Sequence, residues 1–505
     1  MRARLAILLV VALAIAGTGV YALTNLGRDA TDRVVALVPQ DAFLYGHVFL
    51  KPSVDQRKAL RDLLERFDRA PDADEVLDPF FRLIDEGLEQ YGMTYEDDVK
   101  PWLGDQAAFF LTEPETGAVM VATDDVEATR RFAATIFGAE GVEPAQETYE
   151  GVEYDAAEDG AVAYLDDFVV LGTEEAVRSV IDVQEGNDAL EDSAEFADVE
   201  GDVTADRIFS VYFDPGRLAE AAGIATVPDL TGSTGPLSGV GSLIVAGSLR
   251  ADAVVVELAG IKGDVAIPPG VADLASGAPS DAWLAFGLGD IGEFLSTGLS
   301  SAAGASGVSP DALLGEFSLQ TGFDLRDDFL SWMGDLRGFV SGTGLLEFGG
   351  AVSIGSSDPA TSEATIRQLM ALAEQQGIEP QPVEIAGVDG FALPIPGSPQ
   401  PIVVVPGESV VIAYGQSSAE DALDPDESLV DSERFSAASD HLGAGFEPVF
   451  YLDIDAVQQL VENFIPETDV YVDDVKPWLD PIADVISGSK LGDDSYLVRF
   501  VIGVE

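Results

Sequence analysis

A short pattern of residues occurs twice in this chain. Residues 39–44 read Pro-Gln-Asp-Ala-Phe-Leu, and residues 279–284 read Pro-Ser-Asp-Ala-Trp-Leu. Downstream of the first pattern, residues 97–105 read DDVKPWLGD, and residues 327–335 repeat them in altered form as DDFLSWMGD. A duplicated module must close its own core or share one with its twin, so we expect a body built from two tandem homologous repeats.

The order of predicted elements defines the fold class. In the first repeat, a capping box at Ser53 and Gln56 begins a helix, Asp124 or Asp125 caps another, and Thr173 starts a third. Strands and a hairpin alternate with these helices, at 43–50, 107–112, 118–123, 162–165, 168–172, 208–213 and around the turn 250–252. Mixed hairpins and helices predict an α+β fold, mainly antiparallel sheet with flanking helices.

The same order recurs later in the chain. Residues 410–415 match 168–172, and residues 450–455 match 209–214. We therefore expect repeat 1 at 34–260 and repeat 2 at 271–505, with the boundary inside 260–277. Two Gly/Ser-rich stretches, 231–242 and 297–309, are predicted to be mobile loops.

The amino terminus predicts export. Arg2 and Arg4 precede an uncharged apolar run from Leu5 to Leu23, close to the roughly 20 residues that cross a bilayer. We expect residues 1–28 to be a signal anchor, a single transmembrane helix that places the body outside the cytoplasm, followed by a polar tether to Arg33. The alternative is cleavage after Ala14-Ile15-Ala16, which would secrete the body.

Composition limits the partners. The 505 residues include 90 acidic and 26 basic side chains, a net charge of −64, so a nucleic-acid surface is excluded. The charge favours solubility in salty surroundings, or it is a bias shared by all proteins of the source. The chain has no cysteine, which excludes disulfides and thiolate metal sites.

The tryptophan motif occurs a third time. Residues 473–479 repeat residues 97–103 letter for letter. Acidic residues and proline suit a helix start and tryptophan supplies buried surface, so Trp102, Trp332 and Trp478 are interpreted as structural. The functional alternative is weak binding of a divalent cation, with four candidate metal ligands, Asp97, Asp98, Asp327 and Asp328.

Other motifs give no catalytic residue. His47 and His441 occupy non-equivalent places, and His47 is expected to be a packed residue of a strand. Residues 287–292 match a dinucleotide fingerprint, but Asp290 would oppose a pyrophosphate. Ser487 and Lys490 resemble a penicillin-recognition pair without its partner motifs. At this density, pairs of acidic residues carry no information, and we expect no cofactor.

These features together suggest a family. The anchor, the Pro-x-Asp start and the Trp-Leu-Gly-Asp element resemble an uncharacterised bacterial exported family catalogued only as a domain of unknown function (DUF 3352 type). The resemblance covers most of the chain beyond the anchor. It implies an exported, membrane-tethered bacterial protein and assigns no site residue.

The sequence is compatible with three functions. The first is a membrane-anchored extracytoplasmic protein, non-enzymatic, that binds a partner or cargo in the cell envelope, either an envelope protein or a lipid. The second is an envelope hydrolase that uses carboxylates or a serine. The third is a lipid or apolar-ligand carrier with a cavity between the repeats.

Overall fold

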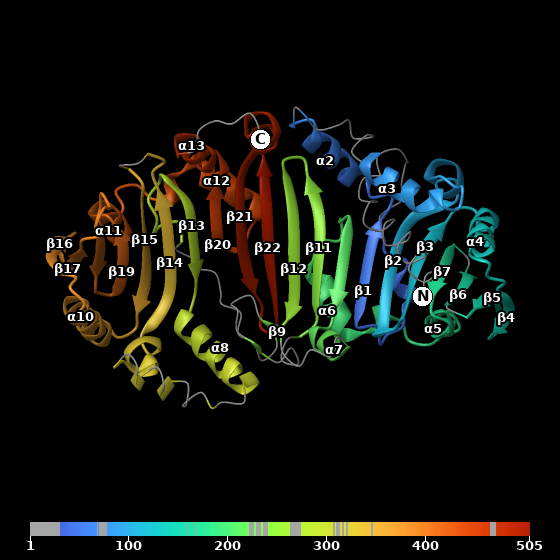
Figure 1. Cartoon of the computed structure of the whole chain (residues 1–505), viewed down its shortest axis with the longest axis horizontal. Helices are drawn as coiled ribbons and strands as arrows, with labels where there is room; N and C mark the ends of the chain where they lie inside the picture. The colour runs from blue at the N-terminus through green and yellow to red at the C-terminus, as the bar shows by residue number, and fades with distance from the viewer. Residues whose placement is uncertain are drawn as a thin grey trace. The chain divides into compact units, whose positions relative to one another are not determined.

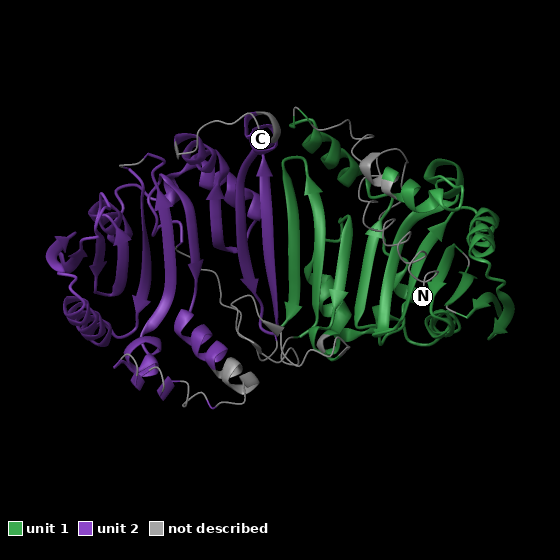
Figure 2. Cartoon of the chain, in the orientation of Figure 1, with its two compact units in different colours: residues 1–224, 240–261 green, residues 225–239, 262–505 purple. Residues whose placement is uncertain are grey.

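The structure is a computed structural model of an α+β chain (Figure 1). It describes residues 31–67, 78–158, 160–165, 167–221, 241–262, 274–306, 322–344, 347–464 and 471–505, with residue 69 and short pieces at 227–228, 234–235, 309, 314–315 and 318–319. The chain divides into two compact units, coloured separately in Figure 2. Unit 1 contains residues 1–224 and 240–261, and unit 2 contains residues 225–239 and 262–505.

Unit 1 contains one antiparallel sheet. Its strands are β1 (Leu44–Phe49), β2 (Leu103–Glu113), β3 (Thr116–Thr123), β4 (Ala145–Tyr149), β5 (Val152–Ala157), β6 (Gly160–Leu165), β7 (Phe168–Gly172), β8 (Phe209–Phe213), β11 (Leu243–Arg250) and β12 (Ala253–Ile261). They pair in the order β4-β5-β6-β7-β3-β2-β1-β8-β11-β12. The first strand of the unit therefore lies inside the sheet, between β2 and β8.

The helices of unit 1 begin where polar caps stand in the sequence. They are η2 (Val35–Leu37), α2 (Val54–Leu64), α3 (Asp78–Glu89), η3 (Tyr95–Val99), α4 (Val126–Glu140), α5 (Glu174–Gln184), η4 (Leu190–Asp192), α6 (Ala194–Asp202) and α7 (Pro215–Ala221). The side chains of Ser53, Asp125 and Thr173 each accept a backbone N–H from the first turn of α2, α4 and α5. These three predicted helix starts are confirmed.

Unit 2 pairs its strands in the same order. They are β13 (Ala282–Leu288), β14 (Met333–Ser341), β15 (Gly349–Ser356), β16 (Gln381–Ile385), β17 (Val388–Leu393), β18 (Ile402–Val405), β19 (Ser409–Tyr414), β20 (Glu447–Asp453), β21 (Ile482–Leu491) and β22 (Ser495–Val504). The order is β16-β17-β18-β19-β15-β14-β13-β20-β21-β22, all antiparallel. The short strands β9 (Val227–Pro228) and β10 (Thr234–Gly235) form a separate pair.

The helices of unit 2 occupy corresponding places between these strands. They are α8 (Ile291–Ser306), η6 (Leu325–Leu330), α10 (Pro359–Gln375), α11 (Gln416–Leu423), η7 (Leu429–Asp431), α12 (Glu433–Leu442), α13 (Ile454–Phe464), η8 (Tyr471–Val475) and α14 (Lys476–Leu479). The segments η3, η6 and η8 are wide π-type turns, and each begins a copy of the tryptophan motif.

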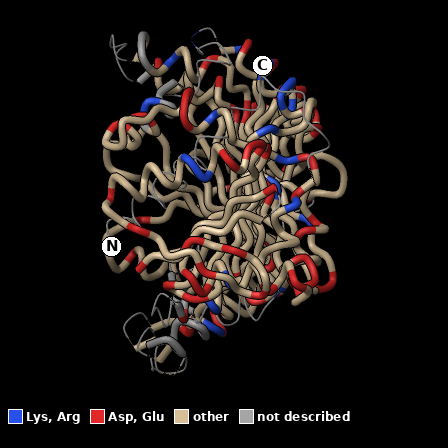
Figure 3. The backbone as a smooth tube through the Cα atoms, turned by 90° about the vertical axis from the view of Figure 1, so that its right-hand side faces the viewer, with Lys and Arg blue, Asp and Glu red and all other residues tan. Residues whose placement is uncertain are grey.

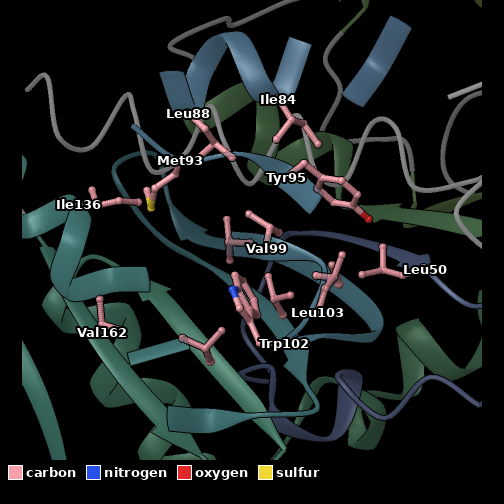
Figure 4. Packing of buried hydrophobic residues seen from close by; sticks show 14 of the residues in the cluster. Leu50, Ile84, Leu88, Met93, Tyr95, Val99, Trp102, Leu103, Ile136 and Val162 are labelled. Atoms are coloured by element: carbon pink, nitrogen blue, oxygen red, sulfur yellow. The ribbon is translucent and has the colours of Figure 1, made fainter. Parts of the chain in front are cut away.

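Helices cover one face of the sheet in unit 1 and one end of the other face. On the first face, α5 packs on β3 and β6, and α6 packs on β11 and β12. The predicted stripe of α5, residues Ala176, Val177, Val180 and Ile181, is fully buried. On the second face, α3, η3 and α4 enclose a core around Trp102 (Figure 4).

Two stretches were predicted to be mobile loops. One of them is largely a helix in the structure, and most of the other lies outside the described residues. Residues 297–306, predicted as a loop, continue helix α8. Of the stretch 231–242, residues 231–233 and 236–240 lie outside the described residues, as does the predicted anchor at 1–28. Among the residues described, no helix is long and apolar enough to span a membrane.

The predicted tether is wrong at its carboxyl end, because Asp32 and Arg33 belong to unit 1. Arg33 forms ion pairs with Asp105 and Asp167 at 2.7 and 3.2 Å. Asp32 accepts hydrogen bonds from the hydroxyl of Tyr45 and from backbone groups at the start of η2.

Candidate functional site

The second face of the sheet in unit 1 is apolar on β8, β11 and β12, beyond α3, η3 and α4. Helix α2 packs on β11, where the side chain of Gln56 bonds the backbone of Leu249. Residues opposite each other on antiparallel strands point to the same face, and here Val245 pairs with Val211 and Leu258. The open face of unit 1 comprises Phe209, Val211, Phe213, Leu243, Val245, Leu249, Val254, Val256 and Leu258. Phe209 is 37% exposed and the others are half-buried.

Unit 2 presents the same kind of surface on β13 and β20–β22. The open face of unit 2 comprises Leu284, Phe286, Leu288, Phe450, Leu452, Val485, Ser487, Val498, Phe500 and Ile502. Phe500 is 40% exposed and the others are half-buried. Ser487, the serine of the penicillin-recognition pair, therefore lies on an apolar strand face opposite Phe450 and Phe500.

Phenylalanine rings lie over glycines on this side of both sheets. Phe109 covers Gly46 and Phe209 covers Gly247 in unit 1, and Phe286 covers Gly338 in unit 2. A Cβ at any of the three glycines would overlap the ring. The missing side chain leaves room for each ring over the neighbouring strand.

The absence of charge from these faces is the most informative property of the described residues. Neither open face, as defined above, contains a charged side chain, although the chain carries 90 acidic and 26 basic residues. Figure 3 shows the acidic positions in red and the basic positions in blue along the backbone, with red the more frequent of the two. An antiparallel sheet whose second face meets only water normally alternates apolar and polar residues. A face without charge, whose residues are all apolar except Ser487 in unit 2, therefore indicates a surface that binds something.

A buried polar cluster lies on the opposite, helix-covered face of unit 1. His47 is in β1, and its Nε2 lies 3.1 Å from Oε1 of Gln106 and 3.5 Å from Oδ1 of Asp32. Burial lowers the pKa of His47 and outweighs the opposing effect of Asp32. The imidazole is therefore neutral at neutral pH and donates from Nε2 to Gln106. The sequence prediction that His47 is a packed strand residue agrees with its 2% exposure.

The cluster continues into a buried ion pair. Arg207 lies 2.6 Å from Glu200 and donates to the backbone oxygen of Thr204, and the backbone N–H of Thr204 donates to Glu257. Burial raises the pKa of Glu200, against the lowering effect of Arg207. Arg207 and Glu257 are 3% and 2% exposed, so these groups are shielded from a substrate and act as internal supports of the fold.

Unit 2 has a different polar cluster, on β20 and β21. Asp453 caps α13 through the backbone N–H of Ala456 and pairs with Arg434 at 2.6 Å. Asp484 is 6% exposed, and among the described residues none donates a hydrogen bond to its Oδ1. Burial raises the pKa of Asp484 to about 6, with a lowering effect from His441 and raising effects from Glu505 and Asp453.

The four candidate metal ligands lie in the wide turns η3 and η6. Asp98 accepts a backbone N–H from Thr94 at 2.8 Å, and Asp328 accepts one from Asp324 at 2.7 Å. In the described parts of the chain, Asp97 and Asp327 join no group of three or more residues able to hold a metal ion. The structure gives Asp98 and Asp328 a role in closing each turn.

The three tryptophans of the motif differ in burial. Trp102 and Trp332 are 6% and 2% exposed, and the indole N–H donates to the backbone oxygen of Asp98 and Asp328, respectively, at 2.6 Å. Trp478 is 44% exposed, although its local sequence equals that of Trp102.

The glycine-rich segment 287–292 connects β13 to α8. Its backbone N–H at Asp290 donates to Asp335 at 3.1 Å, so a carboxylate already occupies the position a phosphate would need. The next strand, β14, runs antiparallel to β13, which differs from the parallel strands of a dinucleotide-binding unit.

Sequence reasoning missed the open faces. The signal is present in strands such as residues 254–258, which read Val-Val-Val-Glu-Leu. Val254, Val256 and Leu258 form one apolar side of this strand. Val255 and Glu257 point to the buried side. Apolar residues on both alternating positions indicate a sheet covered on both faces.

Comparisons with known proteins add a family. Solved structures of TP0453, in crystal forms III, I and IV, are similar to this chain with TM-scores of 0.27, 0.26 and 0.26 and identities of 12%, 13% and 13%. The alignments cover 47%, 47% and 45% of this chain and 83%, 82% and 79% of TP0453. Similarity at this level gives no guide to fold or function. No curated protein sequence matches significantly. The family model DUF3352, described as a protein of unknown function, matches residues 5–494, so the chain belongs to this family.

Proposed function

We propose that this protein is an exported, membrane-anchored binding protein of the cell envelope, without enzymatic activity, that holds an apolar cargo such as a lipid chain on its open sheet faces. The observation that carries the proposal is the absence of charge from both faces in a strongly acidic chain. A lipid chain gains from contact with such a surface because apolar area leaves water.

The acidic surroundings favour one class of cargo. A net charge of −64 repels anionic molecules at low ionic strength, so a neutral or cationic head group is expected on the cargo. The phenylalanine rings at Phe209 and Phe286, which lie over Gly247 and Gly338, would offer an extended chain aromatic contact.

Anchoring and duplication are further parts of the proposal. The apolar run from Leu5 to Leu23 after Arg2 and Arg4 would hold the body at the outer side of the membrane, where lipids are available. We also propose that the two units are tandem copies of one module. The matching order of their strands supports this, and the duplication would give the protein two similar binding faces.

The proposal is tested with a neutral apolar fluorophore, N-phenyl-1-naphthylamine, titrated into the body, residues 31–505. We expect saturable binding of the probe. Phe209→Asp should weaken the affinity of the unit 1 face roughly tenfold, and Phe500→Asp that of the unit 2 face, because a carboxylate under the bound probe must lose its hydration. Ile378→Asp, which adds the same charge at another exposed apolar residue, should leave binding unchanged.

Two outcomes would contradict the proposal. One is a body that binds no probe, and the other is equal binding by all three variants. A long-chain anionic probe, dansyl undecanoate, should bind more weakly than the neutral probe at low salt. Equal affinity for the two probes would refute the preference for a neutral or cationic cargo.

A further inference from the structure

Helix α2 is fastened to the end of β11 by one side chain. The amide of Gln56 accepts the backbone N–H of Leu249 at 2.8 Å and donates to the backbone oxygen of the same residue at 3.2 Å. It also lies 3.2 Å from the carboxylate of Asp206. Figure 1 shows α2 beside this end of β11, on which it packs. The first turns of α2 therefore lie at the Leu249 end of the open face of unit 1.

The next residue, Arg57, is a buried arginine without a counter-charge. It is 8% exposed, its Nε is enclosed without a hydrogen bond, and no described carboxylate pairs with its guanidinium. Arg207, the other buried arginine among the described residues, is paired with Glu200 at 2.6 Å. A chain with 90 acidic residues thus leaves the Arg57 cation unpaired in the part that the structure describes.

Neighbouring residues of α2 do not neutralise Arg57. The carboxylate of Asp62 is bound by Lys58 at 2.7 Å. Arg61, one turn further along the helix, is exposed and likewise forms no ion pair with a described residue, so two like charges stand four residues apart. A buried charge without a counter-charge is costly, and an unsatisfied group of this kind in a native fold indicates a site for an anion.

We propose that Arg57 binds the phosphate group of a lipid head group whose acyl chains lie on the open face of unit 1. The two terminal nitrogens of the guanidinium are not enclosed, and together they can donate to two phosphate oxygens. Arg61 adds a second positive charge on the same side of the helix. This inference rests on the proposed binding of a lipid and assigns its head group.

Carboxylates beside the two arginines select among phosphates. Asp206 lies against Gln56, and Asp55 is exposed in the first turn of α2. Both oppose an anion with more than one negative charge, such as inorganic phosphate, and both attract an ammonium group. A zwitterionic phospholipid presents a phosphate and an ammonium group without net charge. Such a head group agrees with the neutral cargo expected for a chain with a charge of −64.

The helix in the same place of unit 2 has no such residue. Helix α8 follows β13 as α2 follows β1, and its sequence from Ile291 to Ser306 contains no lysine or arginine. The arginine is therefore not a common requirement of the two units. We expect one head-group site in each chain, in unit 1.

The test compares two short-chain lipids that differ in the phosphate-bearing head group. The full chain is kept in solution by a non-ionic amphipathic polymer and titrated with monomeric dihexanoylphosphatidylcholine or with dihexanoylglycerol. Calorimetry gives each Kd, and phosphorus NMR reports the environment of the bound phosphate. The readout is the ratio of the two Kd values, because both lipids offer the same acyl chains to the open faces.

We expect the wild type to prefer the phospholipid. Arg57→Met should lower this preference roughly tenfold, because a hydrogen-bonded charge pair is lost, and should remove the shift of the phosphorus resonance. Arg57→Lys keeps the charge without the planar fork and should give an intermediate ratio. Arg131→Met removes an exposed arginine of α4 and should keep the wild-type ratio.

The melting temperature without lipid separates binding from folding. Arg57→Met removes a buried, unpaired charge, so it should retain or raise the melting temperature of the wild type. A loss of preference in this variant then reports on the site and not on unfolding.

Three outcomes would overturn the head-group assignment. The wild type could show no preference for the phospholipid, Arg57→Met could keep the wild-type ratio, or inorganic phosphate could bind at Arg57 as tightly as the phospholipid, which would define a site for a free anion. Binding of N-phenyl-1-naphthylamine distinguishes these results from a failure of the proposed function. If the fluorophore binds, the head-group assignment alone is wrong; if it does not bind, the cargo proposal itself is contradicted.

Discussion

At the scale of single residues, burial on the strands determines the protonation of two titratable side chains, His47 and Asp484. His47 is neutral because burial disfavours its charged form and Gln106 satisfies Nε2. Asp484 is also buried, but it has no comparable donor at Oδ1 among the described residues. Its carboxyl group lies against Gly503 of β22, so the same burial leaves a charged carboxylate poorly solvated near neutral pH.

Replacing Asp484 by asparagine should stabilise the protein at high pH. The pKa of Asp484 is about 6 in the folded state against an ordinary value of 3.8, so the folded state binds the proton more tightly. The protonated carboxyl group of Asp484 therefore stabilises the folded state fully below pH 4, and this contribution is lost as the pH rises through 6. We expect Asp484→Asn to raise the free energy of unfolding by up to about 2–3 kcal/mol at pH 8 and by nothing at pH 3.5.

Denaturant unfolding at several pH values measures this difference. Asp493→Asn, in the exposed turn before β22, is the matched control and should not change the pH dependence. An equal effect of Asp484→Asn at both pH values would contradict the assigned cause, because a gain in packing alone does not depend on protonation.

At the scale of elements, local signals predicted helices well and isolated hairpins poorly. Ser53, Asp125 and Thr173 act within one turn, so their caps were readable from neighbouring residues. The ribbon β4–β5 was missed because residues 145–148 are all exposed and show no apolar alternation. The glycine and serine content of residues 297–306 predicts a loop, yet these residues continue a helix that packs on η6 and β14.

For the candidate site, too, the sequence predicted the local features and did not predict those that depend on distant segments. The tryptophan motif was visible as a repeated string, and its wide turn and its hydrogen bond to the backbone of Asp98 were not. The cluster around His47 joins Gln106 of β2, Arg207 from the segment before β8, and Asp32 from a segment predicted as a tether. Only the pairing of β1 with β2 and β8 brings them together.

Replacing Gly46 by alanine should destabilise unit 1. A Cβ would overlap the ring of Phe109, which packs against the core around Trp102 and would have to shift. We expect a cost of about 1–3 kcal/mol in the free energy of unfolding. Gly87→Ala in α3, where nothing lies within 4 Å, is the control and should stabilise by up to about 1 kcal/mol. Equal effects at both positions would show that the ring is not constrained.

At the scale of the whole molecule, the acidic surface should make stability depend on salt. Carboxylates outnumber basic groups 90 to 26, so folding brings like charges together, and added ions screen their repulsion. We expect the melting temperature to rise between low and molar sodium chloride. A flat curve would show that the acidic surface has no net effect on stability. Sucrose at matched water activity is the control for solute exclusion.

The position of β1 inside the sheet also has a consequence for how the chain folds. Leu44 pairs with Leu111 on one side and with Phe213 on the other, and Leu284 pairs likewise with Val340 and Leu452. Such distant pairings raise the contact order, which slows folding. During synthesis, each central strand emerges long before one of its two partners, so the apolar strands remain partly unpaired and aggregation-prone until that partner follows.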